Sequence, residues 1–184
     1  EPLLYCKTDT HWSPYACELT AKLIKERLGA PAWLQAKPGA FTTTTGKRTI
    51  TGDLTDGKGS EELPVREVTG THNSALEDKT SPVVLLGDSH TLVFHSGEEL
   101  HGTGAGLAAE LAAELGITVD VIGVRGSGAT PARVNLLRRA RADPAYLAGK
   151  KAVIWCFAAR EFTESTGWSL VPFSSVTRPA GTKP

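Results

Sequence analysis

A short apolar run that ends in Gly-Asp-Ser constrains this chain more than any other part of its sequence. The run, Pro82-Val83-Val84-Leu85-Leu86, leads directly into Gly87-Asp88-Ser89. Four consecutive apolar residues, two of them β-branched, are typical of a central strand that is covered on both faces of a parallel sheet. Ligands of open α/β sheets bind just beyond the carboxyl ends of such strands, so Ser89 is the first candidate nucleophile. The alternative is that Gly-Asp-Ser is only a turn, because all three residue types are common in turns.

Two further runs, 119–124 and 152–158, also read as buried strands. Apolar residues recur at roughly helical spacing between and before them, which predicts helices at 14–28, 106–115 and 131–142. The first helix has the clearest start, since Ser13-Pro14 is an N-cap and first-turn signal, and its apolar positions are Ala16, Leu19, Leu23, Ile24 and Leu28. The alternation of strands and helices predicts an α/β fold, a three-layer α/β/α sandwich with a mostly parallel central sheet.

The length of 184 residues suits one domain rather than two. We expect a catalytic domain at 1–173 and a flexible tail at 174–184, where Ser, Thr, Pro, Gly and Lys predominate. The segment from Pro31 to Ser81 is poor in apolar residues and reads as a short hairpin around Thr49-Ile50-Thr51 within a long surface insertion. Such an insertion either borders a substrate groove or is a solvated decoration. The chain contains no Met, so we expect a processed or excised piece that lacks upstream sequence.

Charge and composition exclude several classes of partner. Lys plus Arg and Asp plus Glu each number 20, and no basic patch with aromatic residues occurs, so neither nucleic acid nor an anionic membrane is expected as a partner. No apolar run is long enough to span a membrane. Cys6, Cys17 and Cys156 lack metal-ligand spacing, so we expect no metal and no cofactor, and each thiol reads as a small buried residue. Cys6 and Cys17 could be bridged only if the first helix folds back on the strand before it.

A carboxylate and an imidazole precede the first helix. Residues 3–7 look like a strand that runs into Asp9 and His11. Residues two apart in an extended segment point to the same side, so Asp9 can orient the His11 ring. The alternative is an Asx-type turn with His11 as a solvated loop residue.

These residues match the needs of acyl transfer, which requires a hydroxyl nucleophile, a base, a group that holds the base, and oxyanion donors. Ser89, His11 and Asp9 supply the first three. Backbone N–H groups at Ser89 and in the turn at Gly126 or Gly128 are candidate oxyanion donors, and Arg160 falls at the end of the last strand on the same sheet edge. The chain lacks Gly-x-Ser-x-Gly, so the nucleophile elbow of the α/β-hydrolases is not its model.

The order of the motifs resembles one family. Gly87-Asp88-Ser89 after a strand, with a Gly turn after the next strand, resembles the SGNH hydrolases. Ordinary members carry an Asp-x-x-His motif near the carboxyl end, whereas here Asp9-Thr10-His11-Trp12 precedes the serine. That order is similar to the SGNH-like domain of the alginate O-acetyltransferases and related exopolysaccharide acetylation proteins. The match covers Tyr5 to Leu28, Gly52-Asp53-Leu54, the serine strand and the Ala-Ala-Arg-Glu-Phe end of the last strand.

The resemblance implies a periplasmic or extracellular bacterial enzyme that moves acetyl groups to or from polysaccharide hydroxyls. It implies a triad of Ser89, His11 and Asp9 with a covalent acyl-serine, and a substrate-side role for Arg160. Its implied partners are a polysaccharide acceptor and an acyl donor, with a membrane-bound acyl-transfer protein as a candidate. The Asn of ordinary members is absent at Phe157-Ala158-Ala159. A carbohydrate or small-ester esterase and an inert scaffold of a polysaccharide assembly complex remain the alternative functions.

Overall fold

A three-stranded parallel sheet lies at the centre of the protein. The structure, a computed structural model, describes residues 2–126 and 128–173. The sheet has the order β4-β3-β5, with β3 (Val83–Gly87) between β4 (Asp120–Gly123) and β5 (Ala152–Cys156). Gly87 pairs with Gly123 on one side and with Cys156 on the other, so the carboxyl ends of the three strands lie side by side.

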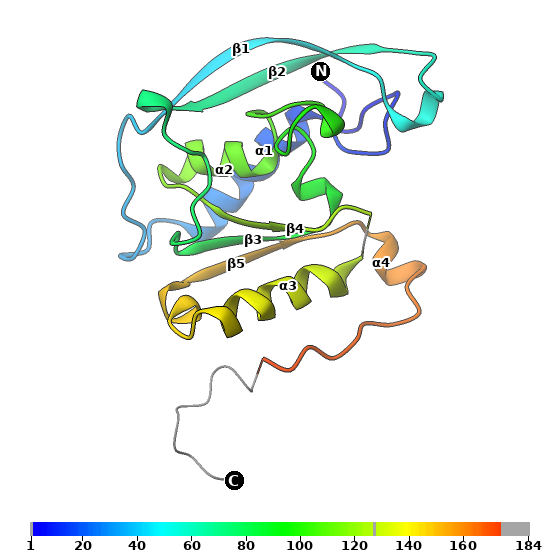
Figure 1. The fold of residues 1–184 in the computed structure, drawn as a ribbon. Helices are drawn as coiled ribbons and strands as arrows, with labels where there is room; N and C mark the ends of the chain where they lie inside the picture. Colours follow the sequence, from blue (N-terminus) through cyan, green and yellow to red (C-terminus); the bar gives the residue numbers. More distant parts are fainter. Residues whose placement is uncertain (1, 127, 174–184) are drawn as a thin grey trace, which may run out of the picture.

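Helices cover both faces of this sheet (Figure 1). α1 (Pro14–Leu28) and α2 (Leu107–Leu115) lie on one face, and α3 (Ala129–Ala142) lies on the other. Alternate side chains of β3 point to opposite faces of the sheet. Val83 and Leu85 pack into the core beneath α1 and α2, whereas Val84 and Leu86 pack against α3. A strand buried on both faces has no polar alternation, which is why it appears in the sequence as a continuous apolar run. The α/β/α sandwich predicted from the sequence is confirmed.

The helices predicted from the sequence are present, with small differences at their ends. Ser13 caps α1, where its hydroxyl accepts a hydrogen bond from Ala16 N at 3.2 Å. The buried face of α1 agrees with the prediction in part: Ala16, Ile24 and Leu28 face the core, but Leu19 and Leu23 are 36% and 56% exposed, and Cys17 and Ala21 are fully buried instead. A short helix, α4 (Arg160–Thr163), follows β5. The remaining turns of the described chain include η1 (Asp53–Thr55), η2 (Thr71–Asn73), η3 (Ser89–Thr91), η4 (Glu98–Leu100) and η5 (Tyr146–Gly149).

A long antiparallel hairpin replaces the short one expected from the sequence. β1 (Phe41–Ile50) pairs with β2 (Glu61–Gly70) along its whole length, and the hairpin packs over α1 and α2 (Figure 1). Three apolar residues of β2 are buried, namely Leu63, Val65 and Val68. Arg66 of the same strand donates hydrogen bonds to Glu110 of α2. The hairpin is therefore part of the packed domain rather than a surface decoration.

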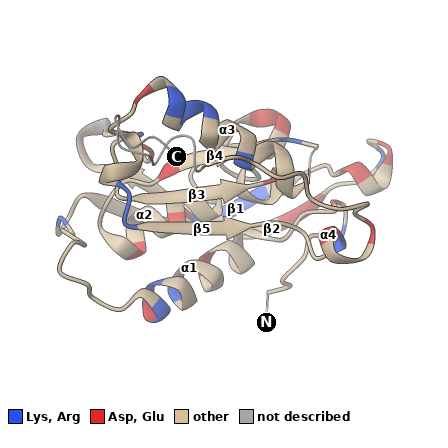
Figure 2. Cartoon of the chain, turned by 90° about the horizontal axis from the view of Figure 1, so that it is seen from below, with Lys and Arg blue, Asp and Glu red and all other residues tan. Residues whose placement is uncertain are grey.

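Other expectations need correction. The predicted strand at 3–7 is wrong, because the segment forms only an isolated bridge between Tyr5 and Trp12. The three cysteines are free thiols, so Cys6 and Cys17 are not bridged. The tail expected at 174–184 lies outside the described residues. Acidic and basic residues are distributed over the fold, with a basic group towards the end of α3 (Figure 2). No helix in the described ranges is both long and apolar enough to cross a lipid bilayer.

Candidate active site

Ser89 stands directly beyond the carboxyl end of the central strand. Asp88 caps the short turn η3, which begins at Ser89, and the Ser89 residue is 8% exposed. The turn can fold over the sheet edge because Gly123, at the end of β4, carries no side chain. A Cβ at Gly123 would lie 2.3 Å from Leu92 Cδ2 and 2.8 Å from Thr91 Oγ1. The backbone around Ser89 is therefore closely packed, and this fixes the position from which the Ser89 side chain extends.

Asp88 ties the serine turn to the neighbouring strand. Its Oδ2 accepts a hydrogen bond from Ala158 N, just beyond β5, and its Oδ1 accepts one from His90 N, both at 2.9 Å. Burial alone would raise the pKa of Asp88, but hydrogen bonding from His90 and Ala158 outweighs it and lowers the pKa. Asp88 is therefore an ionised anchor for the turn, and its Oδ1 also lies 3.3 Å from His90 Nδ1.

Asp9 and His11 form the pair that the sequence suggested. His11 Nδ1 lies 2.6 Å from Asp9 Oδ1, which also accepts a hydrogen bond from His11 N at 2.8 Å. Burial would raise the pKa of Asp9, but hydrogen bonds from His11 N and from the rings of His101 and His11 lower it to about 2. An ionised carboxylate only accepts, so it selects the His11 tautomer with hydrogen on Nδ1 and leaves Nε2 free to act as a base.

The hairpin holds the loop that carries this pair. Glu61 accepts hydrogen bonds from Thr8 N and Thr8 Oγ1, both at 2.8 Å. Asp53 accepts from Thr10 N at 2.8 Å and from Thr10 Oγ1 at 2.7 Å. The residues on both sides of Asp9 are thus fixed by carboxylates from a distant part of the chain. This explains why the loop is ordered without forming a strand.

Two contacts bring the Asp9–His11 loop to the serine turn. The rings of His11 and His90 lie 5.0 Å apart between centroids, and His90 directly follows Ser89. Trp12 Nε1 donates a hydrogen bond to His90 O at 3.0 Å, which fixes the two segments to each other. Among the described residues, no hydrogen bond joins the Ser89 hydroxyl to the His11 ring. Catalytic hydrogen bonds are often long without substrate and tighten in the complex.

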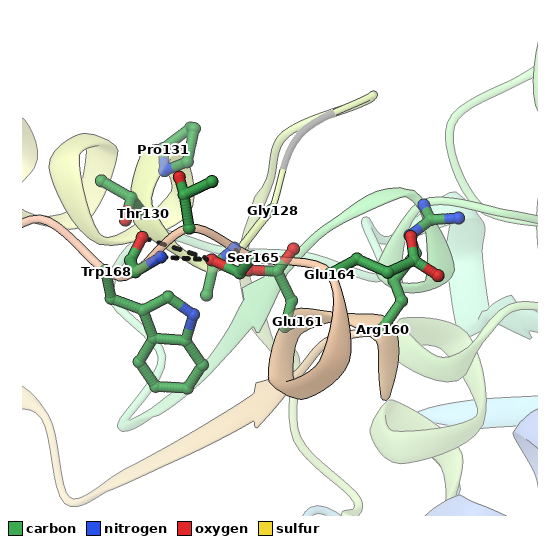
Figure 3. A pocket seen from close by; sticks show the side chains of 11 residues that line it. Gly128, Thr130, Pro131, Arg160, Glu161, Glu164, Ser165 and Trp168 are labelled. Atoms are coloured by element: carbon green, nitrogen blue, oxygen red, sulfur yellow. Dashed lines mark hydrogen bonds between the residues drawn. The ribbon is translucent and has the colours of Figure 1, made fainter.

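Gly128 and Arg160 line a cavity of about 410 Å³ between α3 and α4 (Figure 3). Arg160 lies at one end of the labelled group and Trp168 at the other. The Glu161 carboxylate lies against Gly128 and accepts a hydrogen bond from Ala129 N at 2.9 Å. Gly126 adopts a left-handed conformation with φ 66° and open space beside it. Neither Gly126, Gly128 nor Arg160 shares a hydrogen bond with Ser89 among the described residues, so their oxyanion and substrate roles stay predictions.

His101 is a member of the site that the sequence analysis missed. Its Nε2 lies 2.8 Å from Asp9 Oδ2, the oxygen that His11 does not contact. The residue sits in an irregular segment with no motif around it, 92 positions from its partner. No local signal in the sequence indicates such a contact.

The thiol at the end of β5 does not compete with Ser89. Cys156 pairs with Gly87 in the sheet, and burial together with the charge of Asp88 raises the pKa of Cys156 to about 12. It is therefore protonated and poorly nucleophilic at neutral pH. Residues 2–126 and 128–173 contain no group of three or more His, Cys, Asp or Glu arranged to hold a metal ion.

A serine at the carboxyl end of the central strand of an α/β/α sandwich, with an Asp–His pair beside it, is the architecture of an SGNH hydrolase-like domain. Residues 1–159 match the family model described as the SGNH hydrolase-like domain of the acetyltransferase AlgX, and the chain belongs to this family. A search of the curated proteins found no match.

Two solved structures share the fold. The O-acetyltransferase domain of Pseudomonas putida AlgJ is 22% identical, with a TM-score of 0.65 over 91% of this chain and 56% of that chain. Pseudomonas aeruginosa AlgX is 20% identical, with a TM-score of 0.59 over 84% of this chain and 35% of that chain. This chain therefore spans little more than half of the first protein and about a third of the second.

Proposed function

We propose that this domain transfers acetyl groups to polysaccharide hydroxyls through a covalent acetyl-Ser89 intermediate. The observation that carries the proposal is the Asp9–His11 pair, joined at 2.6 Å and placed against His90, the residue next to Ser89. Acyl transfer requires a serine hydroxyl and an imidazole whose tautomer is set by a carboxylate, and the contact with His90 supports a pairing of Ser89 with His11. Membership of the family of the acetyltransferase AlgX and likeness to the O-acetyltransferase domain of AlgJ support acetyl as the acyl group.

In the first step, Ser89 Oγ attacks the carbonyl carbon of an acetyl ester while His11 Nε2 takes the hydroxyl proton. Asp9 stabilises the imidazolium that forms, and the leaving alcohol departs with the proton from His11. The product is acetyl-Ser89 with His11 neutral again. Backbone N–H groups of the serine turn and the Gly126 turn are the proposed oxyanion donors.

In the second step, a sugar hydroxyl attacks the acetyl-serine. His11 now takes the proton of the sugar hydroxyl and returns it to Ser89 Oγ, so the enzyme is restored and the acetyl group resides on the sugar. With 20 acidic and 20 basic residues the chain has no net charge to attract or repel a polysaccharide, so recognition of the acceptor must come from local groups. Arg160, which lines the cavity between α3 and α4, is proposed to bind donor or acceptor.

The proposed partners follow from this chemistry. The acceptor is an exopolysaccharide such as alginate, and the donor is an acetyl carrier for which a membrane-bound acyl-transfer protein is the candidate. The proposed location is the periplasm or the exterior of a bacterium, as the family resemblance implies.

An acceptor experiment separates transfer from hydrolysis. The protein is incubated with an aryl acetate, with and without an alginate oligosaccharide, and both free acetate and acetylated sugar are measured. A transferase yields acetylated sugar at the expense of acetate. Acetate alone would indicate the esterase, and no release of the aryl alcohol above the Ser89→Ala background would leave the inert scaffold.

A further inference from the structure

Asp9 is held by two imidazoles rather than one. His11 Nδ1 contacts Oδ1 at 2.6 Å, and His101 Nε2 contacts Oδ2 at 2.8 Å. The His101 side chain is 12% exposed, as is that of His11, while that of Asp9 is 6% exposed. Both carboxylate oxygens therefore accept from a ring nitrogen in a largely buried position. One histidine suffices for a triad, so the second needs a separate explanation.

The fold places His101 by contacts that do not involve the serine. Its backbone adopts φ 66°, a left-handed conformation that a residue with a Cβ rarely adopts without support. Arg48 of β1 supplies support, since its Nη1 donates to His101 O at 2.7 Å and its Nη2 donates to Thr103 O at 3.0 Å. The ring packs against Phe94 with 5.5 Å between centroids. Strained backbone of this kind persists where its surroundings determine it, and it is common at functional sites.

The protonation state of the pair follows from the contacts. Asp9 is ionised, so each of its oxygens accepts, and His101 must present N–H at Nε2. Two N–H donors on opposite oxygens stop the carboxylate from rotating about its bond to Cβ. They also share its negative charge, so the fraction of that charge available to stabilise protonated His11 is smaller than with one donor.

We propose that His101 is a positioning residue that fixes the Asp9 carboxylate and thereby sets the orientation and basicity of His11. The inference rests on the proposed function for its catalytic consequence, and on the Asp9 contacts alone for its structural part. It adds a fourth side chain to the Ser89, His11 and Asp9 set and gives β1 a role in the site through Arg48.

The direction of the pH effect follows from the charge on Asp9. Without the His101 donor, the carboxylate charge acts on His11 alone and favours its protonated form, which cannot accept a proton from Ser89. The acid limb of the pH–rate profile then moves to higher pH. Other titratable or charged groups around the three side chains are His90 against His11, Asp88 against His90, Cys6 and Glu61 on the Asp9 side, and Arg48 with Glu67 on the His101 side.

The test compares His101→Leu with His101→Gln. Both substitutes are L-residues with an unbranched Cβ and meet the same backbone strain, but only glutamine keeps an N–H donor near the position of Nε2. We expect His101→Leu to lower kcat for aryl acetate turnover about tenfold or more with little change in KM, as loss of outer supporting hydrogen bonds does elsewhere. The acid limb of its pH–rate profile should move to higher pH. His101→Gln should restore most of kcat and most of the wild-type position of the acid limb.

His95→Leu is the matched control. His95 is also largely buried, at 11% side-chain exposure, and pairs with Glu77 at 3.7 Å rather than with Asp9. His95→Leu should leave the acid limb of the pH–rate profile unchanged. A merely structural role for His101 would lower the melting temperature of both His101 variants without moving the acid limb of either, and that result would overturn the proposal.

A second readout does not depend on turnover. The ring ¹⁵N and N–H proton signals of His11 report its hydrogen bond to Asp9 directly. They should shift in His101→Leu, return towards the wild-type values in His101→Gln and stay unchanged in His95→Leu. Unchanged His11 signals in His101→Leu would overturn the inference even if the enzyme is active. Shifted signals in a protein whose Ser89 never accepts an acetyl group would preserve the positioning role and reject the proposed function instead.

Discussion

Removing Arg66 from its ion pair with Glu110 should destabilise the protein, because it leaves a buried carboxylate beneath the hairpin without this partner. Glu110 is fully buried, and Arg66 donates to its Oε2 through Nε at 2.8 Å and through Nη2. Arg66→Met keeps an apolar stem and removes the charge. Removing one partner of a buried pair costs about 3–5 kcal/mol. In a domain of this size that is a decrease of roughly 6–20 °C in melting temperature.

The loss should depend on pH in a defined direction. Burial raises the pKa of Glu110, and the charge of Arg66 offsets part of that rise. A carboxyl whose pKa is higher in the folded state binds a proton more tightly there. Burial of Glu110 therefore costs no stability below its unfolded pKa, where the carboxyl is protonated in both states. The cost appears as the pH rises through the folded pKa and the buried carboxyl ionises. Without Arg66 the pKa of Glu110 in the folded state rises further. The loss of stability in Arg66→Met should therefore become smaller as the pH is lowered from neutral to about pH 4.

Thermal unfolding followed by circular dichroism at several pH values measures this effect. Lys47→Met is the matched control, because Lys47 pairs with Glu62 at 2.6 Å on the same hairpin but both side chains are exposed. Exposed pairs contribute little, so its melting temperature should hardly change. The double variant Arg66→Met, Glu110→Leu should recover most of the loss. Equal destabilisation by Arg66→Met and Lys47→Met, or a loss that grows towards acid pH, would refute the reasoning.

Four further outcomes are expected. Asp9→Asn should lower the rate of acetyl transfer on the order of ten-thousandfold, by analogy with the serine protease triad in which that loss is known, and steady-state kinetics measures it. Since the pKa of Asp9 is lowered to about 2, the stability that its charge contributes is present above about pH 4 and is lost towards pH 2, so wild type and Asp9→Asn should converge in urea unfolding at acid pH. Gly87→Ala should yield little folded protein by circular dichroism, because the new Cβ would lie 1.9 Å from Cys156 O. Arg160→Ala should raise KM more than it lowers kcat, and an unchanged KM would remove Arg160 from substrate binding.

The sequence alone predicts the features that depend on residues close together in the chain. The strand before Ser89 is buried on both faces, and its uninterrupted apolar run shows this directly. Asp9 and His11 are two residues apart, so their contact follows from local geometry even though the strand predicted before them does not form. The cap at Ser13 likewise involves only a residue three positions away.

Contacts between distant residues could not be predicted in this way. Arg66 and Glu110 are 44 positions apart, and neither lies in a motif. The sequence predicts too short a hairpin because β1 carries few apolar residues. Its residues are mostly exposed threonines and charged side chains, whereas β2 buries several apolar side chains. On α1, Ile24 and Leu28 pack against the core as predicted, but the small residues Cys17 and Ala21 are buried where α2 packs closely, and a count of large apolar residues does not find them.

Peptide mapping by mass spectrometry after brief exposure to an aryl acetate tests the central claim most directly. The account predicts one acetyl group per chain, located on Ser89, which forms rapidly in the wild type, slowly in Asp9→Asn and not at all in Ser89→Ala. The three cysteines should remain unmodified at neutral pH, since burial raises the pKa of each thiol. Undiminished acetyl transfer to an oligosaccharide by Ser89→Ala, or a label that resides only on another residue, would contradict it.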